Sequence, residues 1–235
     1  MSNKKLALVF GGSRGIGADC VAELAGAGYD VAFTYVSKAP EGSAGKGYAV
    51  DIRDGAAVAQ VFTDVERDFG SRPHLVVANA GINVPPGPLA QFKPEDFRQL
   101  VEVNIVGAFN ILAEAARQVQ DGGAIVALTT SMVRHAVPGG GPYTASKAAV
   151  EGLVRSLAKE VAARQVRVNA VAPGPVDTDL FRAGKTDEAK ARSAAMSPFN
   201  RIGQPAEVAQ VVAFLASDKA SWIHGQVIQP NGGMV

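Results

Sequence analysis

The chain has 235 residues, of which 47% are hydrophobic and 19% charged, a composition that suits one globular domain with a buried core. Its 23 basic residues are interspersed among 22 acidic ones and leave a formal net charge of +1, which argues against a nucleic-acid or membrane partner. The single cysteine, Cys20, cannot form an intrachain disulfide, so we expect a cytoplasmic protein whose partners are small molecules.

Short apolar runs alternate with longer helix-like segments along the whole chain. The runs predicted as strands are 6–10, 31–36, 48–50, 75–80, 124–129, 166–171 and 226–229. The segments predicted as helices are 15–27, 55–69, 94–117, 143–164 and 205–216, with a further helix near 187–196. Because parallel strands need crossover connections, this alternation predicts an α/β fold, a mainly parallel sheet flanked by helices, in a single domain over 1–235.

The first apolar run, 6–10, leads directly into a glycine-rich turn. The run stops after five residues, too short for a signal-peptide core, and no later segment approaches the roughly 18 apolar residues of a membrane span. In the turn, Gly11, Gly15 and Gly17 let the backbone bend tightly and approach a pyrophosphate, whose charge would lie at the positive end of the next helix. A strand, a glycine turn and a helix in this order predict a dinucleotide site.

The end of the second predicted strand indicates which dinucleotide binds. A free ribose 2′-hydroxyl favours an acidic residue about 20 positions after the glycines, yet none lies between Asp30 and Glu41. Arg14 in the loop and Lys38 after the strand are cations that could reach a 2′-phosphate, with Ser37 as a neutral donor. We therefore predict NADP (NADPH) in preference to NAD; the alternative is that both cations are ordinary solvated surface residues.

A tyrosine and a lysine lie four positions apart at the start of the helix predicted over 143–164. Tyr143 and Lys147 then share one helix face. An ammonium about 4 Å from the phenol, at an effective dielectric near 20, would contribute on the order of 4 kcal/mol and lower the tyrosine pKa by roughly 3. This spacing predicts Tyr143 as a general acid and base, although an isolated pair of this kind is more often a surface feature.

Ser131 follows the strand predicted over 124–129, so it should lie at the sheet edge where open α/β proteins bind ligands. We expect its hydroxyl to hold a substrate carbonyl, although a serine after a strand is usually a turn former.

The region from about 174 to 203 is the least regular part of the chain, which is typical of a substrate-binding loop or lid. The three histidines are dispersed, and we predict no metal site.

Together these motifs resemble the short-chain dehydrogenase/reductase family, and most closely its 3-oxoacyl-[acyl-carrier-protein] reductase-like members, over essentially the whole chain. The matching stretches are "GGSRGIG" at 11–17, "DIRD" at 51–54, "NAG" at 79–81, "VNIVG" at 103–107, "YTASK" at 143–147, "NAVAPGPVDTDL" at 169–180 and "RIGQPAEVA" at 201–209. The resemblance implies a Rossmann-type, doubly wound sheet of seven strands, and subunits that assemble as homotetramers or homodimers.

The resemblance also implies roles for individual residues. The implied catalytic tetrad is Asn104, Ser131, Tyr143 and Lys147. The cofactor-binding residues, predicted or implied, are Gly11, Ser13, Arg14, Gly15, Ile16, Gly17, Ser37, Lys38, Asp51, Ile52, Asn79, Ala80, Gly81, Tyr143, Lys147, Pro173, Gly174, Val176 and Thr178. Asp51 and Ile52 would lie along the adenine, and Asn104 would anchor a water chain to Lys147 for proton resupply.

Two positions depart from the family pattern. Phe10 stands where the glycine motif usually has threonine, and Ala78 replaces the first asparagine of the usual Asn-Asn-Ala-Gly. Both changes remove a polar side chain that would brace the glycine loop or the neighbouring strands. They leave the implied tetrad intact, so they bear on the rigidity of the loop and on cofactor affinity.

These observations predict an NADPH-dependent oxidoreductase that reduces a ketone or a 3-oxoacyl thioester carbonyl to an alcohol, or runs the reverse oxidation, with Tyr143 as the proton donor. The alternative is a catalytically silent nucleotide-binding regulatory protein, because a fold does not fix a function. Enoyl reduction fits less well, since the four-residue spacing of Tyr143 and Lys147 matches the carbonyl-reducing pattern. Sugar-nucleotide epimerases share the pair but generally need a longer C-terminal domain.

Overall fold

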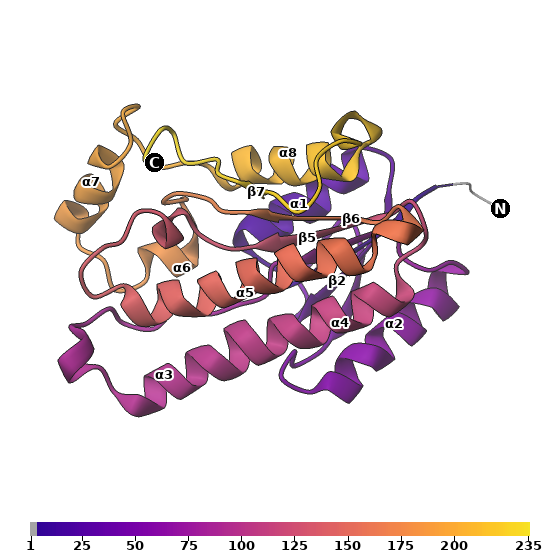
Figure 1. Ribbon diagram of the computed structural model, residues 1–235, viewed down its shortest axis with the longest axis horizontal. Helices are drawn as coiled ribbons and strands as arrows, with labels where there is room; N and C mark the ends of the chain where they lie inside the picture. The colour runs from indigo at the N-terminus through magenta and orange to yellow at the C-terminus, as the bar shows by residue number, and fades with distance from the viewer. Residues whose placement is uncertain (1–3) are drawn as a thin grey trace.

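Seven short apolar segments pair through backbone hydrogen bonds into one parallel sheet. The computed structural model describes residues 4–235, and each predicted strand is present in it (Figure 1). The strands are β1 (Leu6–Phe10), β2 (Asp30–Tyr35), β3 (Lys46–Ala49), β4 (Leu75–Ala78), β5 (Ala124–Leu128), β6 (Arg167–Val171) and β7 (Val227–Ile228). Their order is β3-β2-β1-β4-β5-β6-β7, so the sheet runs outward from β1 in both directions. The crevice at this reversal, beyond the carboxyl ends of the strands, is where such sheets bind ligands.

Helices cover both faces of the sheet, which explains why its strands are apolar throughout. The longer helices are α1 (Gly15–Gly26), α2 (Gly55–Phe69), α3 (Pro94–Leu100), α4 (Ala108–Gln118), α5 (Gly141–Glu160), α7 (Asp187–Ala195) and α8 (Pro205–Ala216). One apolar core lies between the sheet and α2, α4 and α5, and a second lies between the sheet and α1 and α8 (Figure 1). This arrangement confirms the Rossmann-type, doubly wound fold.

The helix expected over 94–117 is interrupted. Between α3 and α4 the backbone forms a π-helical turn, η2 (Val101–Gly107), and the buried Asn104 lies at its centre. The amide of Asn104 accepts a hydrogen bond from the Ile82 N–H at 2.8 Å and donates one to the Ile82 carbonyl at 2.9 Å. A wider turn of this kind often occurs at functional sites, and here it directs one side chain at a backbone segment 22 residues earlier.

The irregular region predicted as a lid forms two short helices, α6 (Asp179–Arg182) and α7, at the end of the molecule where α5 begins (Figure 1). The sequence did not predict α6, which has only four residues. At its base the region is closed by backbone hydrogen bonds, from Gly203 N to Pro175 O at 2.8 Å and from Asp177 N to Gly203 O at 2.9 Å. The two ends of the excursion are therefore held together, and its tip extends beyond the sheet.

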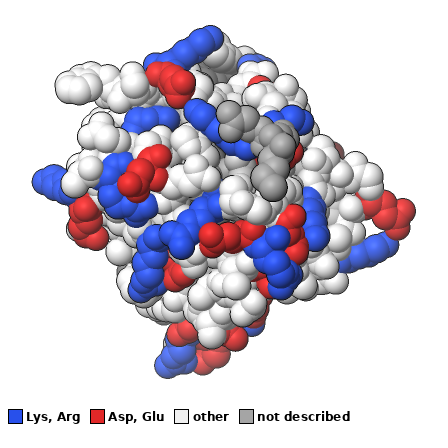
Figure 2. Space-filling view, turned by 90° about the vertical axis from the view of Figure 1, so that its right-hand side faces the viewer, with Lys and Arg blue, Asp and Glu red and all other residues white. Residues whose placement is uncertain are grey.

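Charges of both signs share the surface. Figure 2 shows lysine and arginine side chains intermingled with aspartate and glutamate on one face of the molecule. Several exposed or half-buried pairs are in contact, such as Lys46 with Asp68 at 2.8 Å and Arg67 with Asp64 at 2.7 Å. Within residues 4–235, no helix combines the length and apolar character needed to cross a membrane.

Candidate active site

The glycine turn between β1 and α1 is closed by contacts that only glycine permits. A Cβ on Gly17 would lie 2.0 Å from the Gly11 carbonyl oxygen, and Gly11 itself has a φ of 75°. The Asn79 amide donates a hydrogen bond to that same Gly11 carbonyl at 2.9 Å. Gly17 at the start of α1 and Asn79 after β4 thus both contact the Gly11 carbonyl and hold the turn in place. The glycines also leave the backbone free of side chains where a pyrophosphate would approach.

The brace that the family pattern places at position 10 comes from a different strand. Phe10 is buried and packs on Phe62, with ring centroids 5.7 Å apart. In its place, the hydroxyl of Thr34 in β2 accepts a hydrogen bond from Gly11 N at 2.9 Å, and the Thr34 carbonyl accepts one from Gly12 N at 3.0 Å. Thr34 was not predicted as a functional residue, because its only signal in the sequence is a polar residue within an apolar run.

Three segments that are far apart in the sequence meet beside this loop. Ala80, which follows β4, packs against Gly11, whose Cβ would lie 2.8 Å from the Ala80 Cα. The methyl group of Thr178, at the start of the lid, lies 3.2 Å from where a Gly15 Cβ would be. The structure therefore brings the glycine loop, the "NAG" segment and the first residues of the lid to one edge of the sheet.

The residues expected around the adenosine part of the cofactor are mostly exposed. Asp51 forms an ion pair with Arg53, which holds the pKa of the Asp51 carboxyl below its usual range. Lys38 is exposed and lies 3.3 Å from Glu41, and Ser37 beside it is exposed too. Arg14 is also exposed, and within residues 4–235 its guanidinium forms no side-chain hydrogen bond or ion pair. Of the two predicted phosphate-binding cations, Arg14 is thus more available to a ligand than Lys38.

The remaining predicted cofactor residues belong to the glycine loop, to the segment after β3 and to the segment after β6. Ser13 is half-buried, and Ile16 packs on the core beneath α1. Ile52 is buried, and Val176 is buried beside the lid base, where it pairs with Gly203. Pro173 and Gly174 extend β6 toward the C-terminal segment.

Asn104 and Lys147 converge on Gly81. A Cβ on Gly81 would lie 3.1 Å from the Asn104 Oδ1 and 3.3 Å from the Lys147 Nζ, so a larger residue would displace one of them. Lys147 is 7% exposed, and its ammonium donates a hydrogen bond to the Leu128 carbonyl at the end of β5, at 3.0 Å. The Asn104 amide also donates to the hydroxyl of Ser146, the residue before Lys147, at 3.1 Å. These contacts fix the lysine at the carboxyl edge of the sheet.

The pKa of the Tyr143 phenol differs from the sequence prediction. Burial raises the pKa of the Tyr143 phenol to about 12 and lowers the pKa of the Lys147 ammonium to about 8. The expected lowering of the tyrosine pKa is absent because the ammonium points at the Leu128 carbonyl, and because removal from water disfavours both charged forms. At neutral pH the phenol therefore keeps its proton, which is the state that a proton donor needs.

Ser131 lies at the predicted place, directly after β5 in the short helical turn η3 (Ser131–Val133), but its hydroxyl is fully engaged. It donates a hydrogen bond to the Ala172 carbonyl at 2.7 Å and accepts one from the Asn231 amide at 3.0 Å. The side chain is 0% exposed. These bonds tie the end of β5 to β6 and to the C-terminal segment, a long-range link that no local sequence pattern could predict.

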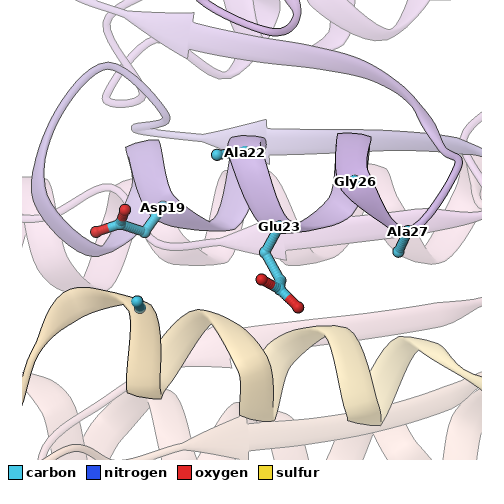
Figure 3. Close-up of a pocket in the computed structure, with 6 residues that line it drawn as sticks. Asp19, Ala22, Glu23, Gly26 and Ala27 are labelled. Atoms are coloured by element: carbon cyan, nitrogen blue, oxygen red, sulfur yellow. The ribbon is translucent and has the colours of Figure 1, made fainter.

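A separate hollow lies on the other side of the sheet. Asp19 and Glu23 of α1 line it, the Glu23 side chain points toward α8, and its volume is about 350 Å³ (Figure 3). Tyr143 and Lys147 belong to α5, which packs on the opposite face, so this hollow is not part of their site. Within residues 4–235, no three His, Cys, Asp or Glu side chains are grouped as metal ligands.

Comparison with known proteins identifies the family. The model of a family described as enoyl-(acyl carrier protein) reductase matches residues 11–235. A solved short-chain dehydrogenase from Burkholderia cenocepacia in complex with NADP superposes with a TM-score of 0.90 at 32% identity, covering 98% of this chain and 97% of that one. The chain belongs to the short-chain dehydrogenase/reductase family. It is therefore an NAD(P)-dependent oxidoreductase.

Two curated members of the short-chain dehydrogenase/reductase family are similar over nearly their full length. A chloroplastic NADPH-dependent aldehyde reductase-like protein of Arabidopsis thaliana is 38% identical over 98% of this chain and 94% of its own. A 3-oxoacyl-[acyl-carrier-protein] reductase of Staphylococcus aureus is 38% identical over 100% of this chain and 99% of its own. The names of these short-chain reductases support carbonyl reduction as the reaction class.

Proposed function

We propose that this protein is an NADPH-dependent carbonyl reductase that converts a ketone or a 3-oxoacyl thioester into the corresponding alcohol and can run the reverse oxidation. The observation that carries this proposal is the placement of a protonated phenol and a buried lysine at the carboxyl edge of the sheet, next to the glycine loop. Tyr143 and Lys147 share one face of α5, and Lys147 is held there by the Leu128 carbonyl at 3.0 Å.

The residues present fit a dinucleotide. The glycine loop offers a backbone surface that a Cβ at Gly17 would fill, and the loop lies at the N-terminus of α1, where backbone N–H groups and the helix dipole favour a phosphate. NADPH, when bound, supplies the hydride to the carbonyl carbon. Tyr143 gives its phenolic proton to the carbonyl oxygen, so that hydride and proton together complete the alcohol.

In this proposal, Lys147 and Asn104 assist the proton donor Tyr143. Lys147 places a positive charge beneath the reacting groups and favours the developing charge on the phenol once the proton has left. Asn104 occupies the π-helical turn and binds the Ser146 hydroxyl at 3.1 Å, one position before Lys147. This amide lies where a water chain to the lysine would begin, and the proton lost by Tyr143 returns by that route.

We assign NADPH rather than NADH on the strength of Arg14. Its guanidinium is exposed at the loop and has no partner within residues 4–235, whereas Lys38 is paired with Glu41 at 3.3 Å. A 2′-phosphate would give the guanidinium a charge-assisted, bidentate partner that the 2′-hydroxyl of NADH lacks. We expect Arg14→Ala to weaken NADPH binding much more than NADH binding, measured by fluorescence titration. Equal losses for the two cofactors would remove the assignment.

The substrate class follows from the lid and from the named relatives. Residues 174–203 act as the lid in this proposal, and the apolar side chains of Phe199 and Val176 line a small cavity at its base. Carbonyl reduction is favoured over enoyl reduction because Tyr143 and Lys147 are four residues apart. An aldehyde reductase-like protein and a 3-oxoacyl reductase among the relatives support the same choice.

The test is NADPH consumption against a panel of aldehydes, ketones and 3-oxoacyl thioesters, with Tyr143→Phe as the control. We expect turnover of at least one carbonyl and a loss of about 100-fold or more in the variant, because a positioned general acid contributes about 10²–10⁴-fold. NADPH binding without turnover on every carbonyl would instead favour the regulatory alternative. Reduction of an enoyl thioester alone would favour the enoyl reaction.

Two further properties complete the proposal. We expect a homotetramer or homodimer, because Trp222 is 98% exposed and because Phe97 and Phe109 are exposed on α3 and α4. Contacts between subunits would bury these apolar side chains. Sedimentation that finds only monomer at micromolar concentration would contradict this expectation.

We also propose a cytoplasmic location, which the single buried Cys20 favours and which cell fractionation can test.

A further inference from the structure

Three residues with hydroxyl side chains, Thr129, Thr130 and Ser131, follow β5 in succession. Two of these hydroxyls already donate their hydrogen to a protein acceptor, so it is not available to a substrate carbonyl. The Thr129 hydroxyl is buried and lies 3.3 Å from the Glu151 carboxylate and 3.4 Å from the Val171 carbonyl, both of them acceptors. The Ser131 hydroxyl donates to the Ala172 carbonyl at 2.7 Å. A hydroxyl has only one hydrogen to donate, so neither can hold a carbonyl oxygen without giving up a buried bond.

Thr130 differs from both neighbours. Its Oγ1 accepts a hydrogen bond from the Met132 N–H at 3.3 Å, and within residues 4–235 it donates to no protein acceptor. Thr130 is 8% exposed, whereas Ser131 is 0% exposed. Its hydrogen is therefore available to a ligand. The bond from Met132 N also aligns the oxygen, since it fixes Thr130 as the cap of the turn that follows.

The level of Thr130 along the sheet matches that of the proton donor. Helix α5 connects β5 to the parallel strand β6, so it runs antiparallel to them. Lys147 contacts the Leu128 carbonyl. From Lys147 back to Tyr143 is one helical turn, about 6 Å, and from Leu128 on to Thr130 is about 6.6 Å in the same direction. Tyr143 and Thr130 therefore stand at the same height beyond the strand end.

A second contact places the start of α5 beside this turn. A Cβ on Gly140, the residue before α5, would lie 2.5 Å from the Met132 side chain. The loop between η3 and α5 thus folds back on itself, and the first turn of the helix, which holds Tyr143, lies against the segment that begins at Thr130. The turn that begins at Thr130 and the first turn of α5 therefore lie side by side at the sheet edge.

We propose that Thr130, and not Ser131, is the catalytic hydroxyl that donates a hydrogen bond to the substrate carbonyl, and that Ser131 is a structural tie between β5, β6 and Asn231. This assignment rests on the proposed carbonyl reduction. The Thr130 hydrogen bond orients the carbonyl and strengthens as its oxygen gains charge during hydride transfer. Thr130 forms and breaks no covalent bond, and the proton that completes the alcohol comes from Tyr143.

The experiment compares Thr130→Val, Thr130→Ser and Ser131→Ala with the wild-type enzyme, using NADPH with acetoacetyl-CoA, ethyl acetoacetate and benzaldehyde. We expect Thr130→Val, which keeps the shape and removes the hydroxyl, to lose about 100-fold in kcat/KM, the usual effect of one lost donor at a developing oxyanion. Thr130→Ser restores the hydroxyl and should stay within about tenfold of wild type. Both should bind NADPH with unchanged Kd, which also shows that they are folded.

Ser131→Ala should keep kcat/KM within about tenfold of wild type and lower the unfolding temperature, because it removes two buried hydrogen bonds. The opposite pattern, an active Thr130→Val enzyme and an Ser131→Ala enzyme that folds and binds NADPH but has lost turnover, would overturn the assignment. In that case the wild type still reduces carbonyls, and the proposed function stands. A wild type that binds NADPH but turns over no carbonyl would overturn the proposed function itself, and the assignment with it.

Discussion

Replacing Lys147 by methionine removes a cation that the fold keeps away from water, and the effect on stability should depend on pH. Burial lowers the pKa of Lys147 from 10.5 to about 8. Between these values the unfolded chain keeps a proton that the folded protein has released, so the free energy of unfolding of the wild type rises with pH. At 1.36 kcal/mol per pH unit, the gain between about pH 8 and pH 9.5 amounts to about 2 kcal/mol.

The methionine variant lacks this titration, so its stability relative to wild type should fall by about 2 kcal/mol over the same interval. Urea unfolding followed by circular dichroism, at pH 7 and pH 9.5 and at fixed protein concentration, measures the difference. Lys159→Met is the matched control, because Lys159 lies on the same helix and is exposed. Parallel pH dependence for wild type and the Lys147 variant would show that the ammonium keeps its proton, and the account of its burial would be wrong.

Three other predictions concern the glycine loop and the reaction. Thr34→Val should weaken NADPH binding about tenfold, because the Gly11 N–H loses its acceptor, while Thr34→Ser should bind normally in the same fluorescence titration. Gly17→Ala should abolish NADPH binding, since its Cβ would lie 2.0 Å from the loop carbonyl, whereas Gly26→Ala in the same helix meets nothing within 4 Å and should bind NADPH as wild type does. The kcat/KM for reduction should fall as pH rises through about 8, where Lys147 loses its proton; a rate that is flat to pH 10 would contradict that role.

Much of the fold could be predicted because its signals are local. A strand buried on both faces must be apolar at every position, as 6–10 is. A glycine turn before a helix can be recognised directly from the order of the residues. The π-helical turn was not visible, because the residues of 101–107 have ordinary helical composition. The turn exists because Asn104 binds the backbone of Ile82, a tertiary contact that outweighs regular helical hydrogen bonding.

In the candidate site too, features set by neighbouring residues could be predicted from the sequence, and features set by distant contacts could not. The glycines and the spacing of Tyr143 and Lys147 were readable, because each depends on neighbours within a turn or two. The expected lowering of the tyrosine pKa by Lys147 was wrong, since Lys147 is bound to a carbonyl 19 residues away. The engagement of Ser131 depends on a partner 100 residues away, and no local pattern carries that information.

Because of the π-helical turn, the direction of the Asn104 side chain depends on the number of residues between α3 and α4 as well as on side-chain identity. A turn of that width holds one residue more than the regular helix that would otherwise run from α3 into α4. Deleting one residue from it would give a more uniform helix, and every side chain on one flank would rotate by about 100° relative to the other. The Asn104 amide would then move away from the Ile82 backbone, so a deletion that makes the helix more regular would break the contact on which the proposed proton path depends.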